Sequence, residues 1–136
     1  MTAFVDTNIL IRHLTGDPPT QARRATRYLD QTDQLLLADL ILAEVAYVLE
    51  SYYEVARPQV AETLHAILAF PAIRVVDGDL LQRAIEVYEV HGLDFADAYL
   101  VASAERTGVG VVASFDRGID RVGTVRREEP GVPADA

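Results

Sequence analysis

Residues 3–14, AFVDTNILIRHL, join a short apolar segment to an amphipathic one through a single carboxylate, that of Asp6. The first four residues are typical of a buried strand, and residues 7–14 have the apolar spacing of a helix. The stretch therefore predicts a strand followed directly by a helix, with Asp6 at the junction.

The same alternation continues along the chain, between breaker residues such as Gly, Pro and Asp. Further helices are predicted over residues 20–31, 39–53, 58–69, 79–91 and 94–106, and strands over 35–38, 73–76, 109–113 and, more briefly, 124–126. Short apolar strands alternating with helices predict an α/β fold, here one three-layer α/β/α domain with a mostly parallel sheet of four or five strands. We expect this domain to span residues 1–127, and residues 128–136 to form a flexible tail.

Composition limits the possible chemistry. The chain has 136 residues, 50% of them hydrophobic, which suits one folded domain rather than a disordered chain. The absence of cysteine excludes thiol catalysis and zinc–thiolate sites and is compatible with a reducing cytoplasm. No signal peptide and no apolar run of about 18 residues is present, so we expect a cytoplasmic protein without a membrane span.

The net charge is −9, and every one of the 12 basic residues is arginine. This balance is unusual for a protein that binds nucleic acid, because phosphate contacts generally come from basic patches. Two interpretations stay open: the acidity keeps the protein soluble, or some acids form a cation site that a basic partner covers.

Four carboxylates stand out by position. Asp6 and Asp116 directly follow predicted strands, and sites in parallel α/β sheets lie beyond the carboxyl ends of strands. The alternative is a helix cap for Asp6 and an ordinary turn residue for Asp116. Glu44 and Asp97 lie among apolar residues on predicted helices, where an unpaired carboxylate is costly. For Glu44 the alternative is a side chain that reaches solvent or pairs with arginine, and Asp94 with Asp97 could form a capping arrangement.

As a set, these acids favour a metal site, because a bound cation offsets the repulsion between them and Mg²⁺ or Mn²⁺ prefers oxygen ligands. Other catalytic devices lack support. The histidines show no metal-ligand spacing, and the sequence has no Gly-x-Ser-x-Gly elbow, P-loop or Gly-x-Gly-x-x-Gly motif.

Four segments in register resemble PIN domains, specifically the VapC-type toxins of bacterial toxin–antitoxin pairs. They are VDTNILIRHLTGD from Val5, LILAEVAYVLESYY from Leu40, GLDFADAYLVASA from Gly92 and VVASFDRGIDRV from Val111. The resemblance implies an α/β/α fold with a parallel sheet and divalent-metal-dependent cleavage of RNA to a 5′-phosphate and a 3′-hydroxyl.

The resemblance also implies roles for single residues. Asp6, Glu44, Asp97 and Asp116 match the four family acids; we expect Asp6, Asp97 and Asp116 to hold Mg²⁺ or Mn²⁺ and Glu44 to position or deprotonate the attacking water. Asp94 matches an auxiliary position. Asn8 and Ser114 match positions that hydrogen-bond the acids.

Partners are likewise implied: RNA as substrate, a small cognate antitoxin as inhibitor, and a second copy of the chain in a homodimer. Phosphate contacts are expected from arginines near the first motif, although a solvated helix face explains them equally well; they are Arg12, Arg23, Arg24 and Arg27. Two other functions stay open, a catalytically silent PIN-like scaffold and a metal-dependent phosphoesterase acting on DNA or small substrates.

Overall fold

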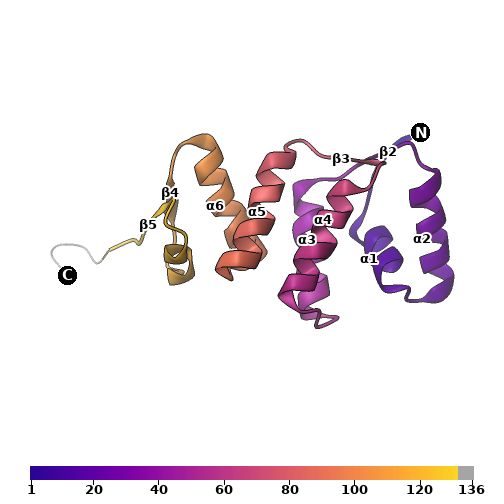
Figure 1. Cartoon of the computed structure of the whole chain (residues 1–136), viewed down its shortest axis with the longest axis horizontal. Coiled ribbons are helices and arrows are strands. Elements are labelled where there is room, and N and C mark those ends of the chain that lie inside the picture. Colours follow the sequence, from indigo (N-terminus) through magenta and orange to yellow (C-terminus); the bar gives the residue numbers. More distant parts are fainter. Residues whose placement is uncertain (132–136) are drawn as a thin grey trace. The chain divides into compact units, whose positions relative to one another are not determined.

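The computed structural model describes residues 1–131 and divides the chain into two compact units, Met1–Gly78 and Asp79–Ala136 (Figure 1). Each unit combines helices with parallel strands. The predicted α/β class with parallel strands is therefore confirmed, and the prediction of one domain over residues 1–127 stays a prediction.

The first unit contains a three-stranded sheet in the order β1-β2-β3. In chain order its elements are β1 (Thr2–Phe4), α1 (Thr7–Thr15), α2 (Pro19–Gln31), β2 (Gln34–Leu36), α3 (Asp39–Ser51), α4 (Arg57–Ala69) and β3 (Ile73–Arg74). In the parallel register Ala3 pairs with Leu35 and Leu35 with Ile73. Leu35 is fully buried, so the middle strand lies in the core.

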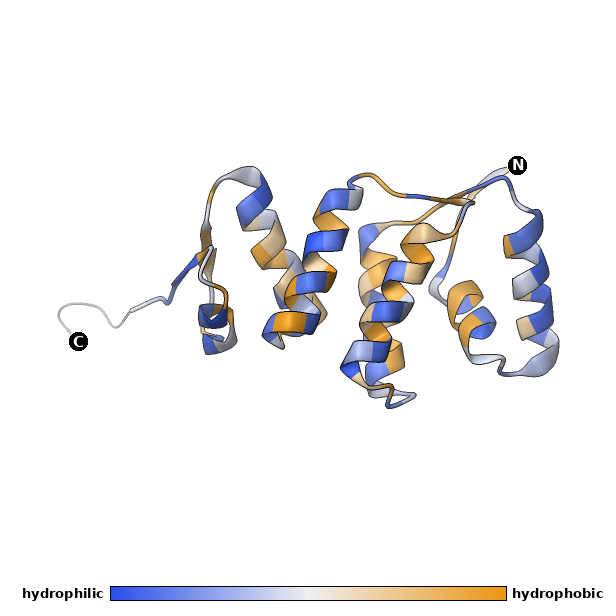
Figure 2. Cartoon of the chain, viewed as in Figure 1, coloured by the Kyte–Doolittle hydropathy of each residue, from blue (hydrophilic) through white to orange (hydrophobic). Residues whose placement is uncertain are grey.

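The helices of this unit differ in character. Figure 2 shows that α1 is rich in hydrophobic residues, whereas α2 is mostly hydrophilic. Accordingly α2 buries only a narrow apolar stripe, formed by Ala22, Ala25 and Leu29. Its remaining surface is left for polar and charged side chains.

The second unit contains α5 (Gly78–His91), α6 (Phe95–Thr107), β4 (Val111–Ala113), the 3₁₀ helix η1 (Arg117–Arg121) and β5 (Arg126–Glu128). Strands β4 and β5 pair in parallel, with Val112 opposite Arg127. Gly92, with φ +71°, turns the chain after α5 in a left-handed conformation that favours glycine.

All six predicted helices are present, and the differences lie at ends and turns. Helix α3 begins at Asp39, and Ala38 is its N-cap residue. The helix η1 was not predicted, because its only sequence signal is the turn-like Asp-Arg-Gly. Strand β5 lies two residues later than predicted, so Glu128 belongs to a strand and not to the tail. The rest of the predicted tail lies partly outside the described residues.

No helix within residues 1–131 is long and apolar enough to cross a membrane.

One ion pair links α5 to α6. Arg83 donates from Nε to Oε1 of Glu105 at 2.8 Å and from Nη2 to Oε2 at 2.9 Å, and Thr124 also hydrogen-bonds Glu105. The hydrogen bond from Arg83 is the main reason why the pKa of Glu105 lies below its ordinary value. The Glu105 side chain is 19% exposed, so solvent screens this bidentate pair only in part.

We predict that Glu105→Gln lowers the free energy of unfolding by about 1–2 kcal/mol at neutral pH, because it removes charge-assisted hydrogen bonds to Arg83. Since the pKa of Glu105 is lowered in the folded state, this stabilisation is present above the unfolded pKa of about 4.3 and is lost as pH falls through the folded value. Urea unfolding of both proteins across pH measures it. Glu89→Gln, at an exposed position of α5, is the control, and an equal loss there would contradict the assignment.

Candidate active site

Asp6 follows β1 and occupies the N-cap position of α1, with extended backbone (φ −89°, ψ 155°). Its side chain makes no capping hydrogen bond, although Asp at this position commonly does. The residue is exposed. The cap alternative therefore does not describe what this carboxylate does, and its oxygens are available to a ligand.

Glu44 lies on α3 and accepts a hydrogen bond at Oε2 from Oγ1 of Thr7, at 2.9 Å. Thr7 is 4% exposed and directly follows Asp6, so this bond ties Glu44 to the start of α1. The predicted apolar surroundings of Glu44 are wrong: Leu40 and Tyr47 are 77% and 69% exposed. Helix α3 buries a different face, formed by Leu42, Val45, Ala46 and Leu49.

Asp97 lies in the first turn of α6 and is half-buried, beside the buried residues Ala98 and Val101. Asp94 is at the N-cap of this helix but makes no side-chain capping hydrogen bond. Both carboxylates thus lie at the same helix end, and neither fulfils the capping arrangement that the sequence left open.

Asp116 lies at the N-cap of η1, where its Oδ1 accepts a hydrogen bond from the backbone N–H of Gly118 at 2.8 Å. The Asp116 backbone N–H donates to Oγ of Ser114 at 2.9 Å. Ser114 therefore holds the Asp116 backbone rather than its carboxylate. Asp116 is therefore a turn residue, as the alternative interpretation predicted. Its side chain has another neighbour besides Gly118.

That neighbour is Asp97, whose carboxyl group is within hydrogen-bonding reach of Asp116. Burial, the hydrogen bond with Asp116 and repulsion from Asp116 and Asp94 raise the pKa of Asp97. The Gly118 N–H, the hydrogen bond with Asp97 and the positive charges of Arg121 and Arg127 lower the pKa of Asp116. These surroundings therefore favour the protonated form of Asp97 and the ionised form of Asp116.

Two carboxyl groups that approach so closely need a proton or a cation between them. Their oxygens are the ligands that Mg²⁺ and Mn²⁺ prefer, so the pair fits part of a divalent-metal site. Within residues 1–131 no three carboxylate or histidine side chains come close enough together to hold a metal ion.

Of the predicted site residues, the structure brings Asp97 and Asp116 together in the second unit, with Asp94 nearby. In the first unit it brings Glu44 to Thr7, the neighbour of Asp6. Thr7 and Gly118 escaped the sequence analysis. The sequence signals that could have identified them are a Thr directly after the strand-end residue Asp6 and a Gly two residues after Asp116.

The family model of the PIN domain matches residues 3–125. This chain belongs to the PIN domain family. PIN domains are generally nucleases, so the acids described above lie in a chain of a nucleic-acid-cleaving family. No curated protein sequence matches the chain.

Among solved structures, the PIN chain is similar to a crystal structure of VapBC2 from Rickettsia felis bound to a DNA fragment from their promoter. The identity is 14%, the similarity covers 96% of this chain and 100% of that chain, and the TM-score is 0.38.

We predict that Asp97→Asn raises the melting temperature of the metal-free protein by about 2 °C at neutral pH. The pKa of Asp97 is raised in the folded state, so its charged form costs stability once pH rises above that value, and the amide removes this cost. Calorimetry in a chelator measures the change. Asp79→Asn, in the first turn of α5, is the matched control; a lower melting temperature for Asp97→Asn alone would contradict the repulsion.

Proposed function

We propose that this PIN domain is a divalent-metal-dependent endoribonuclease. The observation that supports this most directly is the carboxyl pair of Asp97 and Asp116, because such a pair attracts a cation and both residues lie in segments that resemble acidic motifs of the family. RNA as the substrate rests on the resemblance of the four motifs to VapC-type toxins.

The resemblance of the four motifs makes Asp6, Asp97 and Asp116 the proposed ligands of Mg²⁺ or Mn²⁺. Asp6 contributes an exposed carboxylate that is not engaged in capping, and the lowered pKa of Asp116 favours its ionised form beside Asp97. When bound, the ion lowers the pKa of a water molecule and neutralises charge on the scissile phosphate. Asp94 adds negative charge beside Asp97 and is an auxiliary residue.

Glu44 is proposed to orient the attacking water or to accept its proton. Its side chain is exposed, and the bond from Thr7 to Oε2 limits its rotation while the other carboxylate oxygen stays available. General bases need this combination of fixed position and access to water. Thr7 is accordingly a positioning residue that acts through Glu44.

We further propose that the chain is a toxin that blocks translation in the cytoplasm by cleaving RNA, that it forms a homodimer, and that a small antitoxin inhibits it. The motif resemblance supports this role. The net charge of −9 also favours a basic inhibitor, since charge complementarity selects partners and speeds their association.

The proposal predicts RNA cleavage in Mg²⁺ or Mn²⁺ that stops in a chelator. Asp6→Asn and Asp97→Asn should each lower kcat/KM at least about 100-fold, because even residues that only support a metal ligand contribute 10- to 100-fold. Asp79→Asn should cleave like the wild type. Gel analysis of labelled RNA measures the rates, with circular dichroism to verify folding.

Three substrates separate the alternatives. Faster cleavage of DNA or of a small phosphoester than of RNA would identify a different phosphoesterase. A scaffold would cleave none of them and would bind Mn²⁺ no more tightly than its Asp97→Asn variant in a calorimetric titration. Normal cleavage by both Asp→Asn variants would show that the site is misassigned.

A further inference from the structure

Helix α2 carries arginines that have no acidic partner. The chain has 21 acidic residues, and arginines elsewhere form salt bridges, as Arg57, Arg83 and Arg127 do. In the part of the chain that the structure describes, the three exposed arginines of α2 form none; they are Arg23, Arg24 and Arg27. Such guanidinium groups are free to bind phosphate.

A groove of about 510 Å³ separates α1 from the Arg24 side of α2, and its polar lining consists of Asn8, Arg12, Gln21, Arg24 and Tyr28. Arg12 is held in place, since its Nε donates to Oε1 of Gln21 at 3.0 Å. Asn8 is two residues after Asp6, so the groove begins beside a proposed metal ligand. The half-buried Tyr28 adds an aromatic ring to the two guanidinium groups.

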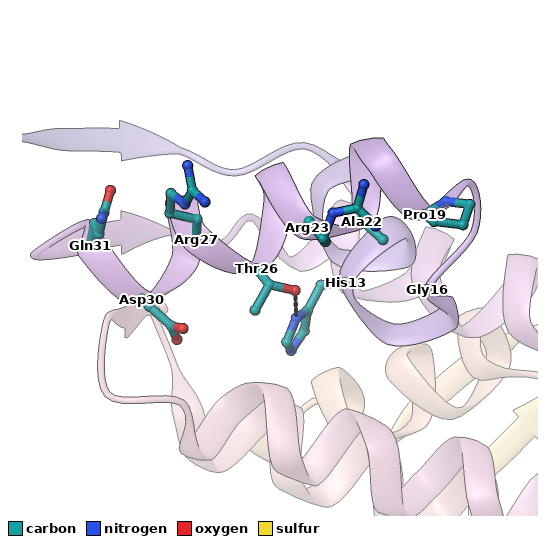
Figure 3. Close-up of a pocket in the computed structure, with 9 residues that line it drawn as sticks. All are labelled: His13, Gly16, Pro19, Ala22, Arg23, Thr26, Arg27, Asp30 and Gln31. Carbon is teal, nitrogen blue, oxygen red and sulfur yellow. Dashed lines mark hydrogen bonds between the residues drawn. The ribbon is translucent and has the colours of Figure 1, made fainter.

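The opposite side of α2 has a groove of about 610 Å³ with a different character. Its lining includes Arg23, Arg27 and Asp30 of α2, and Figure 3 shows the two arginines pointing to one side of the helix and Asp30 to the other. His13 is bound to Thr26 at 2.8 Å, and the Asp30 carboxylate repels phosphate. The arginines of this groove therefore share it with a carboxylate, whereas the lining of the Arg24 groove contains none.

We propose that the Arg24 groove binds the single-stranded RNA segment next to the cleaved bond. Arg24 and Arg12 contact backbone phosphates, and the ring of Tyr28 stacks on a base, the combination by which proteins bind single strands. The inference rests on the proposed function, because it assigns to the same RNA substrate a binding site distinct from the carboxylates.

Binding of the full chain to a fluorescein-labelled single-stranded RNA of mixed sequence, followed by anisotropy in a chelator, tests the groove without cleavage. Arg24→Gln should weaken binding about fivefold or more and reduce the slope of log K against log salt by about 0.7, the value for one phosphate contact on a single strand. Tyr28→Leu should weaken it about tenfold, and Tyr28→Phe should restore wild-type affinity. Arg23→Gln, the adjacent exposed arginine, is the matched control and should change affinity less than about twofold.

Equal losses for Arg24→Gln and Arg23→Gln would overturn the proposal, because α2 would then attract RNA only through diffuse charge. Unchanged RNA affinity in Arg24→Gln would overturn it too. That result is also the one expected if the groove binds an acidic protein segment instead of RNA. Because Arg24 is exposed, Arg24→Gln should fold normally, so its result does not depend on whether Tyr28→Leu folds. If RNA is bound in the predicted pattern but never cleaved, the Arg24 groove is supported and the proposed nuclease function is contradicted. If wild type and Arg24→Gln cleave RNA equally well, the nuclease function is supported and the Arg24 groove is contradicted.

Discussion

Two carboxyl groups within hydrogen-bonding reach of each other require a positive charge between them, and the second unit is built so that Asp97 and Asp116 meet under this constraint. Asp97 is held in place by the first turn of α6, where the nearby residues Phe95 and Ala98 are buried. Asp116 is fixed by Gly118 and Ser114, one binding its carboxylate and the other its backbone. A proton satisfies the pair in the absence of metal, and a divalent ion can replace that proton.

Arginines set the turn that carries Asp116. Arg127 pairs with both carboxylate oxygens of Asp120, at 3.0 and 3.2 Å, and donates to the carbonyl oxygen of Ser114. Arg121 donates to the carbonyl oxygen of Gly92, at the turn between α5 and α6. These arginines are therefore engaged in hydrogen bonds within the second unit, and their charges lower the pKa of Asp116.

How far the sequence predicts this molecule depends on the kind of signal. Periodicity located all six α-helices of residues 1–131, because apolar spacing is a local property that burial preserves. The position of Asp6 after β1 was also readable, because a strand end is marked by the loss of apolar residues. Glu44 shows the limit: its apolar neighbours suggested a buried stripe, yet α3 buries another face and exposes Leu40 and Tyr47. Which apolar face of a helix is buried depends on packing against other elements. The Thr7–Glu44 bond spans 37 residues and was invisible for the same reason.

The division of charge between the acids and α2 resolves the apparent conflict between an acidic chain and an anionic substrate. Carboxylates repel phosphate until a divalent ion is bound, so affinity for the proposed RNA substrate has to come from cations elsewhere on the surface. We propose that Arg24 of α2 supplies such charge in the first unit, where Asp6 and Glu44 also lie. In the proposed function, metal governs the rate of cleavage, and the Arg24 groove governs the affinity for RNA and its dependence on salt. An overall net charge of −9 describes neither surface, because each acts over about the Debye length of 8–10 Å rather than over the whole protein.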